Sequence, residues 1–508
     1  MVVDNLSTKS KEGTEIRVAA VGDVWAGGFR RLAVYDEPEF MELVDLIRDS
    51  DVGFVNMETV YLDDKNKVPY RPIGQGGMGF EFHYADNIIA KDLRWMGFNI
   101  CSCSMNHTVD WGFEGVLSTR RVLDDAGFTH AGTGETLSEA SRPGYMQTKN
   151  GAVAIVSTNF DFNNNWANMA TDPTPLVPPG TARPGANTIR IDWVVDPETF
   201  KEILNFQKHI GGGPRLVGRL SRDPWYKKYF GSDVISVGSM PYYIIKGKEA
   251  GTYVYSQMRK ADFERNLLSV KEAAGMADWV IFSVHDHIKD GKGVYKSPPW
   301  EGGAGEIPSK AAQTLAKAVI EAGADFYVGH ACVSSYQGIE IYKGKPIFYN
   351  IGIFQETTEA FRLIPWGIYD NLFLPLDTPL NEIIDYLAWH SGRKGGYDLE
   401  TYKKERRLVN NDPWPTKDFG YGGPDKELYW TGLLVKFKLE GEQGHDRKVT
   451  EIKLYPADLR GDMPRAIRGR PLMAKGKIAE KVLERIQKNS EQFGTKIEIN
   501  DNVGTVVL

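Results

Sequence analysis

Five short apolar runs in this chain each end at polar side chains that can bind a metal or transfer a proton. Each run has the length of a buried strand, and helical patterns separate the runs. The polar residues at the five ends are Asp23, Asn56 with Glu58, Asn106 with His107, His285 with His287, and His330. In an open α/β sheet, ligands bind at the edge formed by the carboxyl ends of the strands. The pattern therefore predicts an α/β fold with one polar site at that edge.

The alternation of strand and helix patterns extends over most of the chain. Strands are predicted at 16–21, 52–57, 99–104, 152–157, 279–284 and 325–328, and helices at 40–47, 90–96, 115–126, 262–276 and 309–322. Lys343-Gly344-Lys345 separates two apolar segments and predicts a hairpin over 337–350. The C-terminal part predicts a strand pair at 433–439 and 449–454, a helix at 475–490 and a hairpin at 496–508.

A proline-rich and aromatic stretch at about 159–252 interrupts the alternation. Its aromatic residues are Trp193, Trp225, Tyr226, Tyr229, Tyr242 and Tyr243. A local satellite core is the favoured interpretation, and a lid or substrate wall is the alternative. Because one site would take residues from Asp23 to His330, we expect residues 15–360 to form one domain carrying this insertion. Residues 361–508 are predicted to be an extension packed on the same domain.

Composition excludes several classes of protein. The 508 residues include 61 Lys and Arg and 67 Asp and Glu, a formal charge of −6, which provides no basic surface for nucleic acid. No apolar stretch reaches the ~20 residues of a membrane-spanning helix, and polar residues interrupt the N-terminus before a signal peptide could form. Three cysteines exclude a disulfide framework. We therefore expect a soluble, cytoplasmic protein without membrane or nucleic-acid partners, with a homo-oligomer left open.

Each polar strand end also has a purely structural interpretation. Asp23 could cap a helix, Glu58 could be a solvated acid, and His107 could be a core histidine. His285 and His287 lie two residues apart, so on an extended strand both face one side. They could chelate one ion, or one could bind the ion and the other the substrate. Because four of the nine histidines lie at these junctions, the site is the favoured interpretation.

Asp110, three residues after His107, has two interpretations of equal weight. It could accept the second ring N–H of an imidazole, or it could cap the helix that is predicted from Gly115. The candidates for binding a phosphate or carboxylate of the substrate are Asn56, Arg71, Arg183 and Arg190. Carboxylate, carboxamide and imidazole ligands favour Mn, Zn or Fe over metals that prefer cysteine thiolates. The residues therefore predict one or two divalent ions, and a carboxylate shared by two ions would give a two-metal site.

At these strand ends the sequence resembles the CapA family, the poly-γ-glutamate capsule-synthesis type. The matching segments are VAAVGDVW, VNMETV, SMNHTVDWGFEG, AGTGETLSEA, RPGANTIR, SVHDH, and DFYVGH followed by QGIEIYKGKPIFYNIGIF, with similarity continuing to RGRPLMAKG and FGTKIEI. The resemblance implies the four-layer α/β/β/α sandwich of calcineurin-type metallophosphoesterases. It also implies a set of metal ligands, which are Asp23, Glu58, Asn106, His285 and His330. By the same resemblance His107 is the proton-donating histidine, and His287 is the second histidine of a variant His-x-His motif.

The sequence departs from the pattern of the family at three positions. Metallophosphoesterases usually begin Asp-x-His, but here Val24-Trp25 follows the aspartate, so one metal position lacks a ligand. Ala331-Cys332 follows His330 where a further histidine is common, and Gly352-Ile353-Phe354 replaces Gly-Asn-Phe. Capsule-type members are membrane-anchored, and this sequence shows no anchor.

The sequence thus predicts a metal-dependent hydrolase in which a metal-activated water attacks an ester, amide or phosphoester bond. His107 would protonate the leaving group. The expected substrate is a small or medium organic molecule or an oligomer. The alternative is a non-enzymatic accessory protein that handles poly-γ-glutamate or another anionic polymer.

Overall fold

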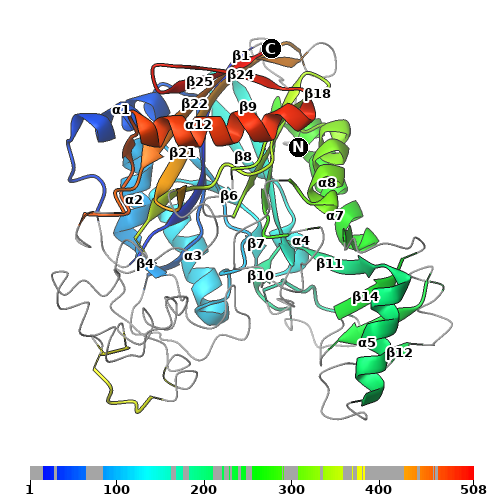
Figure 1. Cartoon of the computed structure of the whole chain (residues 1–508). Coiled ribbons are helices and arrows are strands. Elements are labelled where there is room, and N and C mark those ends of the chain that lie inside the picture. Colours follow the sequence, from blue (N-terminus) through cyan, green and yellow to red (C-terminus); the bar gives the residue numbers. More distant parts are fainter. Residues whose placement is uncertain are drawn as a thin grey trace, which may run out of the picture.

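Two large β-sheets with helices beside them make up the computed structural model of this chain (Figure 1). The structure describes residues 15–27, 31–63, 84–161, 168–174, 182–209, 220–221, 228, 232–237, 242–247, 255–288, 290, 307–331, 336–357, 369, 374–379, 382–383, 428–442, 447–461, 463 and 467–508. The protein is a mixed α/β protein, as the alternation of strand and helix patterns predicts.

The first sheet has ten strands in the order β24-β25-β22-β21-β20-β1-β2-β5-β6, with β23 paired to β22. The strands are β1 (Glu15–Trp25), β2 (Val52–Asn56), β5 (Ile100–Ser102), β6 (Thr129–Ala131), β20 (Ile353–Glu356), β21 (Thr431–Glu440), β22 (Lys448–Asp458), β23 (Leu472–Met473), β24 (Lys496–Asn500) and β25 (Val503–Val507). β1 runs parallel to β2 and β20 and antiparallel to β21. β21 lies beside residues 15–21 of β1, and β20 lies beside residues 23–25. The neighbour of β1 therefore changes at Asp23.

The second sheet has eleven strands in the order β12-β13-β14-β11-β9-β16-β17-β19-β18, with β15 paired to β11 and β8 to β9. The strands are β8 (Gly144–Thr148), β9 (Gly151–Asp161), β11 (Thr188–Val195), β12 (Leu220–Ser221), β13 (Val234–Val237), β14 (Tyr242–Lys246), β15 (Tyr255–Met258), β16 (Trp279–His285), β17 (Phe326–His330), β18 (Ile339–Tyr342) and β19 (Lys345–Phe348). β16 is parallel to β9 and β17, and His285 is in register with both Asn159 and His330. Two short pairs complete the strands, β3 (Val60–Leu62) with β4 (Tyr84–Asp86) and β7 (Thr133–Gly134) with β10 (Gly185–Ala186).

Helices pack against each sheet through their apolar stripes. α1 (Pro38–Arg48), α2 (Asn87–Met96) and α3 (Gly112–Ala126) share a buried cluster with the first sheet. α7 (Lys260–Met276) and α8 (Lys310–Ala322) share another with the second sheet, on the opposite side of the molecule (Figure 1). Other helices in the described part of the chain are α4 (Leu137–Ala140), α5 (Pro197–His209), α12 (Lys477–Ser490) and the 3-10 helix η5 (Glu491–Phe493). In α8, Ser309 accepts the backbone N–H of Ala312 and so caps the first turn.

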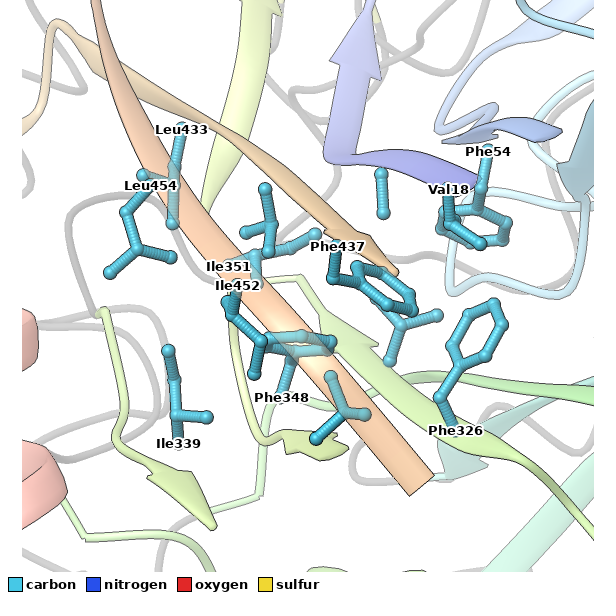
Figure 2. Close-up of a cluster of buried hydrophobic side chains, with 14 of the residues drawn as sticks. Val18, Phe54, Phe326, Ile339, Phe348, Ile351, Leu433, Phe437, Ile452 and Leu454 are labelled. Atoms are coloured by element: carbon cyan, nitrogen blue, oxygen red, sulfur yellow. The ribbon is translucent and has the colours of Figure 1, made fainter. Parts of the chain in front are cut away.

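The largest apolar core contains side chains from both sheets (Figure 2). Val18 and Phe54 come from the first sheet, and Phe326 and Phe348 come from the second. The α12 side chains Val482, Leu483 and Ile486 belong to the same core. Burial of each large apolar side chain stabilises the fold by ~1.5–3 kcal/mol. This core joins the two sheets and fixes where their carboxyl ends lie.

The predicted strands and helices are confirmed, with small shifts in their bounds. β1 is longer than predicted, because it continues through Asp23 to Trp25 instead of ending at residue 21. Gly22 allows this continuation, since a Cβ at that position would lie 1.8 Å from the carbonyl oxygen of Gly352. None of the described helices combines the length and the apolar character that a membrane crossing requires.

Part of the 159–252 stretch forms a small apolar cluster of its own, while Phe160, Ile189 and Ile191 belong to the cluster shared with α7 and α8. Val195, Phe200, Ile235 and Ile244 make up the small cluster, and Trp193 packs against it. A satellite core, the favoured interpretation of the sequence, is therefore present. Trp225, Tyr226 and Tyr229 lie outside the described residues, and the lid remains a prediction.

Candidate metal centre

The polar residues predicted at the strand ends come together in one place. We call them the histidine–carboxylate cluster; its members are Asp23, Asn56, Glu58, Asn106, His107, His285, His287 and His330. All are buried except His287, which is half-buried. The register of β1 with β2 and of β16 with β17 sets their positions, because it aligns Asp23 with Asn56 and His285 with His330.

Asp23 holds one side of the cluster. Its Oδ1 accepts a hydrogen bond from Asn56 Nδ2 at 2.6 Å and lies 2.9 Å from His330 Nδ1 and 3.6 Å from His285 Nδ1. The other ring nitrogen of His330, Nε2, lies 2.9 Å from the Ser283 hydroxyl. A histidine ring held in this way presents Nδ1 to the carboxylate, so Ser283 orients His330. Ser283 lies two residues before His285 on β16, so the two side chains point to the same face of the strand.

Glu58 holds the other side. Its Oε1 lies 3.2 Å from His285 Nε2 and 4.0 Å from His107 Nε2. His285 Nε2 also lies 2.7 Å from Asn106 Oδ1 and 3.2 Å from His287 Nε2. The imidazole of His285 thus contacts Asp23 with one ring nitrogen and Glu58 with the other, at the centre of the cluster.

Asp110 contacts His107 directly. The two side chains meet through Asp110 Oδ2 and His107 Nδ1, which are 2.5 Å apart, so the remaining ring nitrogen of His107 faces Glu58. α3 begins at Gly112 with Trp111 as its N-cap, so Asp110 does not cap this helix. Of the two interpretations of Asp110, the structure supports the orienting carboxylate.

The carboxylates and imidazoles shift one another's pKa values. Burial raises the pKa of Glu58 to about 7, and the nearby Asp23 adds to this shift. Burial alone would lower the pKa of His285, but Glu58 and Asp23 outweigh it and raise that pKa to about 10. Burial opposes ionisation of Asp23, yet His330 and His285 hold its pKa well below the usual range. Burial, followed by the charge of His285, lowers the pKa of His287. In the metal-free protein a positive charge on His285 therefore offsets part of the negative charge of the two carboxylates.

The residues of the cluster fit a divalent cation. Two groups of three, Asp23–His285–His330 and Glu58–His285–His287, bring their ligand atoms within 4.8 Å of one another. Three buried oxygens of the cluster accept no hydrogen bond from the described residues, namely Asp23 Oδ2, Asn56 Oδ1 and Glu58 Oε1. Unpaired buried polar atoms are rare in proteins. Oxygen and imidazole ligands suit Mn, Zn or Fe.

The backbone beside His330 is strained. Ala331 has a φ of 118°, a region that residues with a side chain rarely adopt. Such a conformation costs ~1–3 kcal/mol and persists only where surrounding contacts impose it. One such contact is the hydrogen bond from the Asp286 backbone N–H to the His330 carbonyl oxygen, at 2.8 Å. Strain of this kind is concentrated at functional sites.

The candidate substrate-binding arginines have different surroundings. Arg190 donates to Asp262 through Nε at 2.7 Å and through Nη2 at 3.0 Å, so its guanidinium is committed to an ion pair outside the cluster. Arg183 is half-buried and donates to the Met169 carbonyl oxygen. The residue before Met169, Asn168, donates to the carbonyl oxygen of Asn106, a contact that sequence reasoning missed. Arg183 therefore contacts a segment, residues 168–169, that adjoins the cluster. Arg71 lies outside the described residues.

Comparison with known proteins identifies the family of this chain. The model of the family described as bacterial capsule synthesis protein PGA_cap matches residues 17–356, a range that includes the whole histidine–carboxylate cluster. The chain belongs to this family. The predicted resemblance to CapA is thereby confirmed, and the family is related to metallophosphoesterase-like hydrolases.

Two relatives of similar length come from one bacterium. The uncharacterized proteins y4sH and y4uA of Sinorhizobium fredii (strain NBRC 101917 / NGR234) are each 32% identical to this chain over 495 residues. The alignments cover 97% of this chain and 93% of each relative. A crystal structure of a hypothetical protein from Thermus thermophilus matches 87% of this chain and 99% of its own, with 11% identity and a TM-score of 0.32. A likeness at that level carries no argument about fold or function.

Proposed function

We propose that this family member is a metal-dependent hydrolase acting on an ester, amide or phosphoester bond of a small or medium organic substrate. The observation that supports this most directly is the set of buried, unpartnered oxygens on Asp23, Asn56 and Glu58 beside the imidazoles of His285 and His330. Apolar packing fixes the strands that carry these groups. Buried carboxylate and amide oxygens that accept no hydrogen bond are the kind of ligand that a cation-binding site requires.

In this proposal the sheets and helices form a four-layer α/β/β/α sandwich. The family domain spans 15–360, with the insertion at about 159–252 and an extension at 361–508. The helix clusters on either side and the shared core between the sheets support this arrangement.

Asp23, Glu58, Asn106, His285 and His330 would hold the ion. A neutral imidazole has one lone pair for a metal. Both three-residue groups share His285, which can serve only one ion, so the two groups together would form one set of ligands. We therefore propose one fully ligated Mn, Zn or Fe ion.

When bound, a divalent ion supplies Lewis acidity and lowers the pKa of water to ~7. His107 is the proposed proton donor to the leaving group, work that typically accelerates a reaction ~10²–10⁴-fold. Asp110 fixes the ring of His107 so that Nε2 faces the cluster. His287 extends the cluster on the Glu58 side, and Arg183 is the arginine best placed to meet an anionic substrate group.

A non-enzymatic role in handling poly-γ-glutamate or another anionic polymer is the second candidate. Two departures from related metallophosphoesterases favour it: Trp25 stands where their Asp-x-His motif has a histidine, and no further histidine follows His330 in Ala331-Cys332. A binding protein needs fewer ligands than a catalyst that must hold and activate water.

One experiment separates these functions. Protein purified without a histidine tag is analysed for metal by mass spectrometry and then assayed with generic phosphodiester, ester and amide substrates in added Mn²⁺ or Zn²⁺. We expect the wild type to bind one ion per chain and to turn over one of these substrates, and His285→Ala to lose both properties. His130→Ala is the matched control, because His130 pairs with Asp124 outside the cluster.

The outcomes discriminate clearly. Wild type that binds no metal and shows no turnover would overturn the hydrolase. Metal binding without turnover of any substrate class would favour the accessory role. Unchanged metal content in His285→Ala would overturn the ligand assignment.

A further inference from the structure

Trp25 lies at the end of β1, two residues after Asp23. The pairing of β1 with β20 is irregular between Asp23 and Val24, and the contact of the indole with Glu58 places the Trp25 side chain beside the cluster. The indole of Trp25 is only 5% exposed, and its Nε1–H donates a hydrogen bond to Glu58 Oε2. The same carboxylate keeps Oε1 on the side of His285, 3.2 Å from Nε2.

The backbone of Trp25 is fixed from two directions. Its carbonyl oxygen accepts hydrogen bonds from the Thr357 N–H at 2.8 Å and from the Thr357 hydroxyl at 3.3 Å. The next residue, Ala26, donates its N–H to the Thr59 hydroxyl at 3.0 Å. Thr357 follows β20, and Thr59 follows Glu58 itself. The indole therefore extends from a backbone that is tied to the segment carrying its acceptor.

We propose that Trp25 is a positioning residue that makes Glu58 bind the ion through Oε1 alone. An indole N–H is a donor without a lone pair, so it cannot ligate a metal. Its hydrogen bond occupies Oε2 and leaves Oε1, which has no hydrogen-bond partner among the described residues. This inference rests on the proposed metal centre and adds a residue that the ligand set does not contain.

Trp25 stands at the position that the histidine of the Asp-x-His motif occupies in related sequences. Where they have a histidine, this chain has a group that can only donate. In this proposal the Trp25 indole replaces a histidine that would bind a second ion. The indole instead orients Glu58, which binds the one ion that this chain holds. Partners of this kind typically change metal affinity 10–100-fold when they are removed.

The test compares two identical substitutions. Trp25→Phe removes the indole N–H beside the cluster. Trp279→Phe is the matched control, because Trp279 is equally buried and its indole N–H donates to the Asn150 carbonyl oxygen at the amino end of β16. Mn²⁺ or Zn²⁺ affinity is measured by competition with a chromogenic chelator. We expect Trp25→Phe to bind about 10–100-fold more weakly and Trp279→Phe to bind like the wild type.

Failure of this inference and failure of the proposed function give different results. Wild type that binds neither metal would overturn the metal centre itself. Wild type that binds metal, with Trp25→Phe binding equally well, would overturn only the positioning role. Equal weakening in both variants would also overturn it, because the effect would then come from general loss of packing.

A measurement on the wild type keeps the inference testable if Trp25→Phe does not fold. A crystal structure of the metal-loaded protein is expected to show Glu58 bound to the ion by Oε1 alone, with Oε2 still on the indole. Bidentate binding, or a bond from Oε2 to the ion, would overturn the proposal.

Discussion

Two buried groups of charged side chains in this protein balance their charges in different ways. One is the histidine–carboxylate cluster. The other, the arginine network, lies on β11, on α7 and at the residue preceding α7, and consists of Arg190, Asp192, Arg259, Asp262 and Arg265. Both contain two carboxylates that are inaccessible to solvent. They differ in the groups that face those carboxylates.

In the arginine network, guanidinium groups neutralise each carboxylate. Arg259 donates to Asp192 through Nε at 3.0 Å and through Nη2 at 2.7 Å. Asp262 receives Nε of Arg190 at 2.7 Å and Nη1 of Arg265 at 2.8 Å. No carboxylate oxygen of these two residues is among the described buried atoms that have no hydrogen-bond partner.

In the cluster, the positive charge resides on imidazole instead. A guanidinium does not lose its proton in proteins, whereas an imidazole can release its proton when a metal binds. The arginine network is therefore electrostatically complete, while the cluster can exchange a proton for a cation. Burial of charge alone does not identify a binding site; the chemistry of the counter-charge does.

The largest expected effect tests this difference with one substitution in each region. Asp23→Asn removes a proposed ligand charge, and Asp192→Asn removes a charge of the same kind from the arginine network. Loss of orienting partners already costs 10–100-fold in metal affinity, so we expect Asp23→Asn to weaken Mn²⁺ or Zn²⁺ binding by more than about 100-fold. Asp192→Asn should leave the affinity unchanged. Chelator competition measures both, and equal losses would remove the distinction between the two regions.

A loss of folding stability, instead of metal affinity, is expected when the arginine network loses its cation. Arg259→Leu leaves Asp192 buried without its partner, which typically destabilises a protein by about 3–5 kcal/mol. The double variant Arg259→Leu/Asp192→Leu replaces the pair with apolar groups and should be more stable than the single variant. Urea unfolding of the metal-free protein measures both. A single variant as stable as the wild type would show that the network contributes nothing to stability.

The smallest effect concerns acid stability. Burial opposes ionisation of Asp262, but Arg190 and Arg265 outweigh it and lower its pKa below the usual 3.8. A carboxyl with a lowered pKa stabilises the folded state at higher pH, and this contribution is lost as the pH falls below 3.8 toward the lowered value. Asp262→Asn should therefore show a shallower loss of stability below that pH. An unchanged acid profile, measured by thermal unfolding, would contradict the assignment.

The sequence predicted that the residues of the cluster lie close together, because each of them can be recognised from the short stretch of sequence that forms its own strand. An apolar run that ends in a histidine or carboxylate defines both a strand and a strand end. Parallel neighbours then bring those ends together, as β16 and β17 do for His285 and His330. The spacing of three residues between His107 and Asp110 allowed two interpretations, and only the start of α3 at Gly112 distinguishes them.

Partners that are distant in the sequence could not be predicted in this way. Arg190 carries no local sign that it pairs with Asp262, which lies on α7 in a later part of the chain. From the sequence, Trp25 is interpreted only as the absence of a metal ligand. The Asp-x-His motif shows that a histidine is missing at this position, but it does not predict the residue to which the indole donates its hydrogen bond. Only the packing of the segments that follow β1 and β2 brings that indole to Glu58.

The pairing of β1 has a consequence for how the protein is made. Glu15 pairs with Glu440, so the strand that carries Asp23 receives its antiparallel neighbour from β21, beyond the residues that the family model matches. A ribosome synthesises β1 early and β21 late, and until then β1 presents an open edge that can pair wrongly. We therefore expect the metal centre to assemble only after most of the chain has been translated, so that metal loading follows synthesis instead of accompanying it.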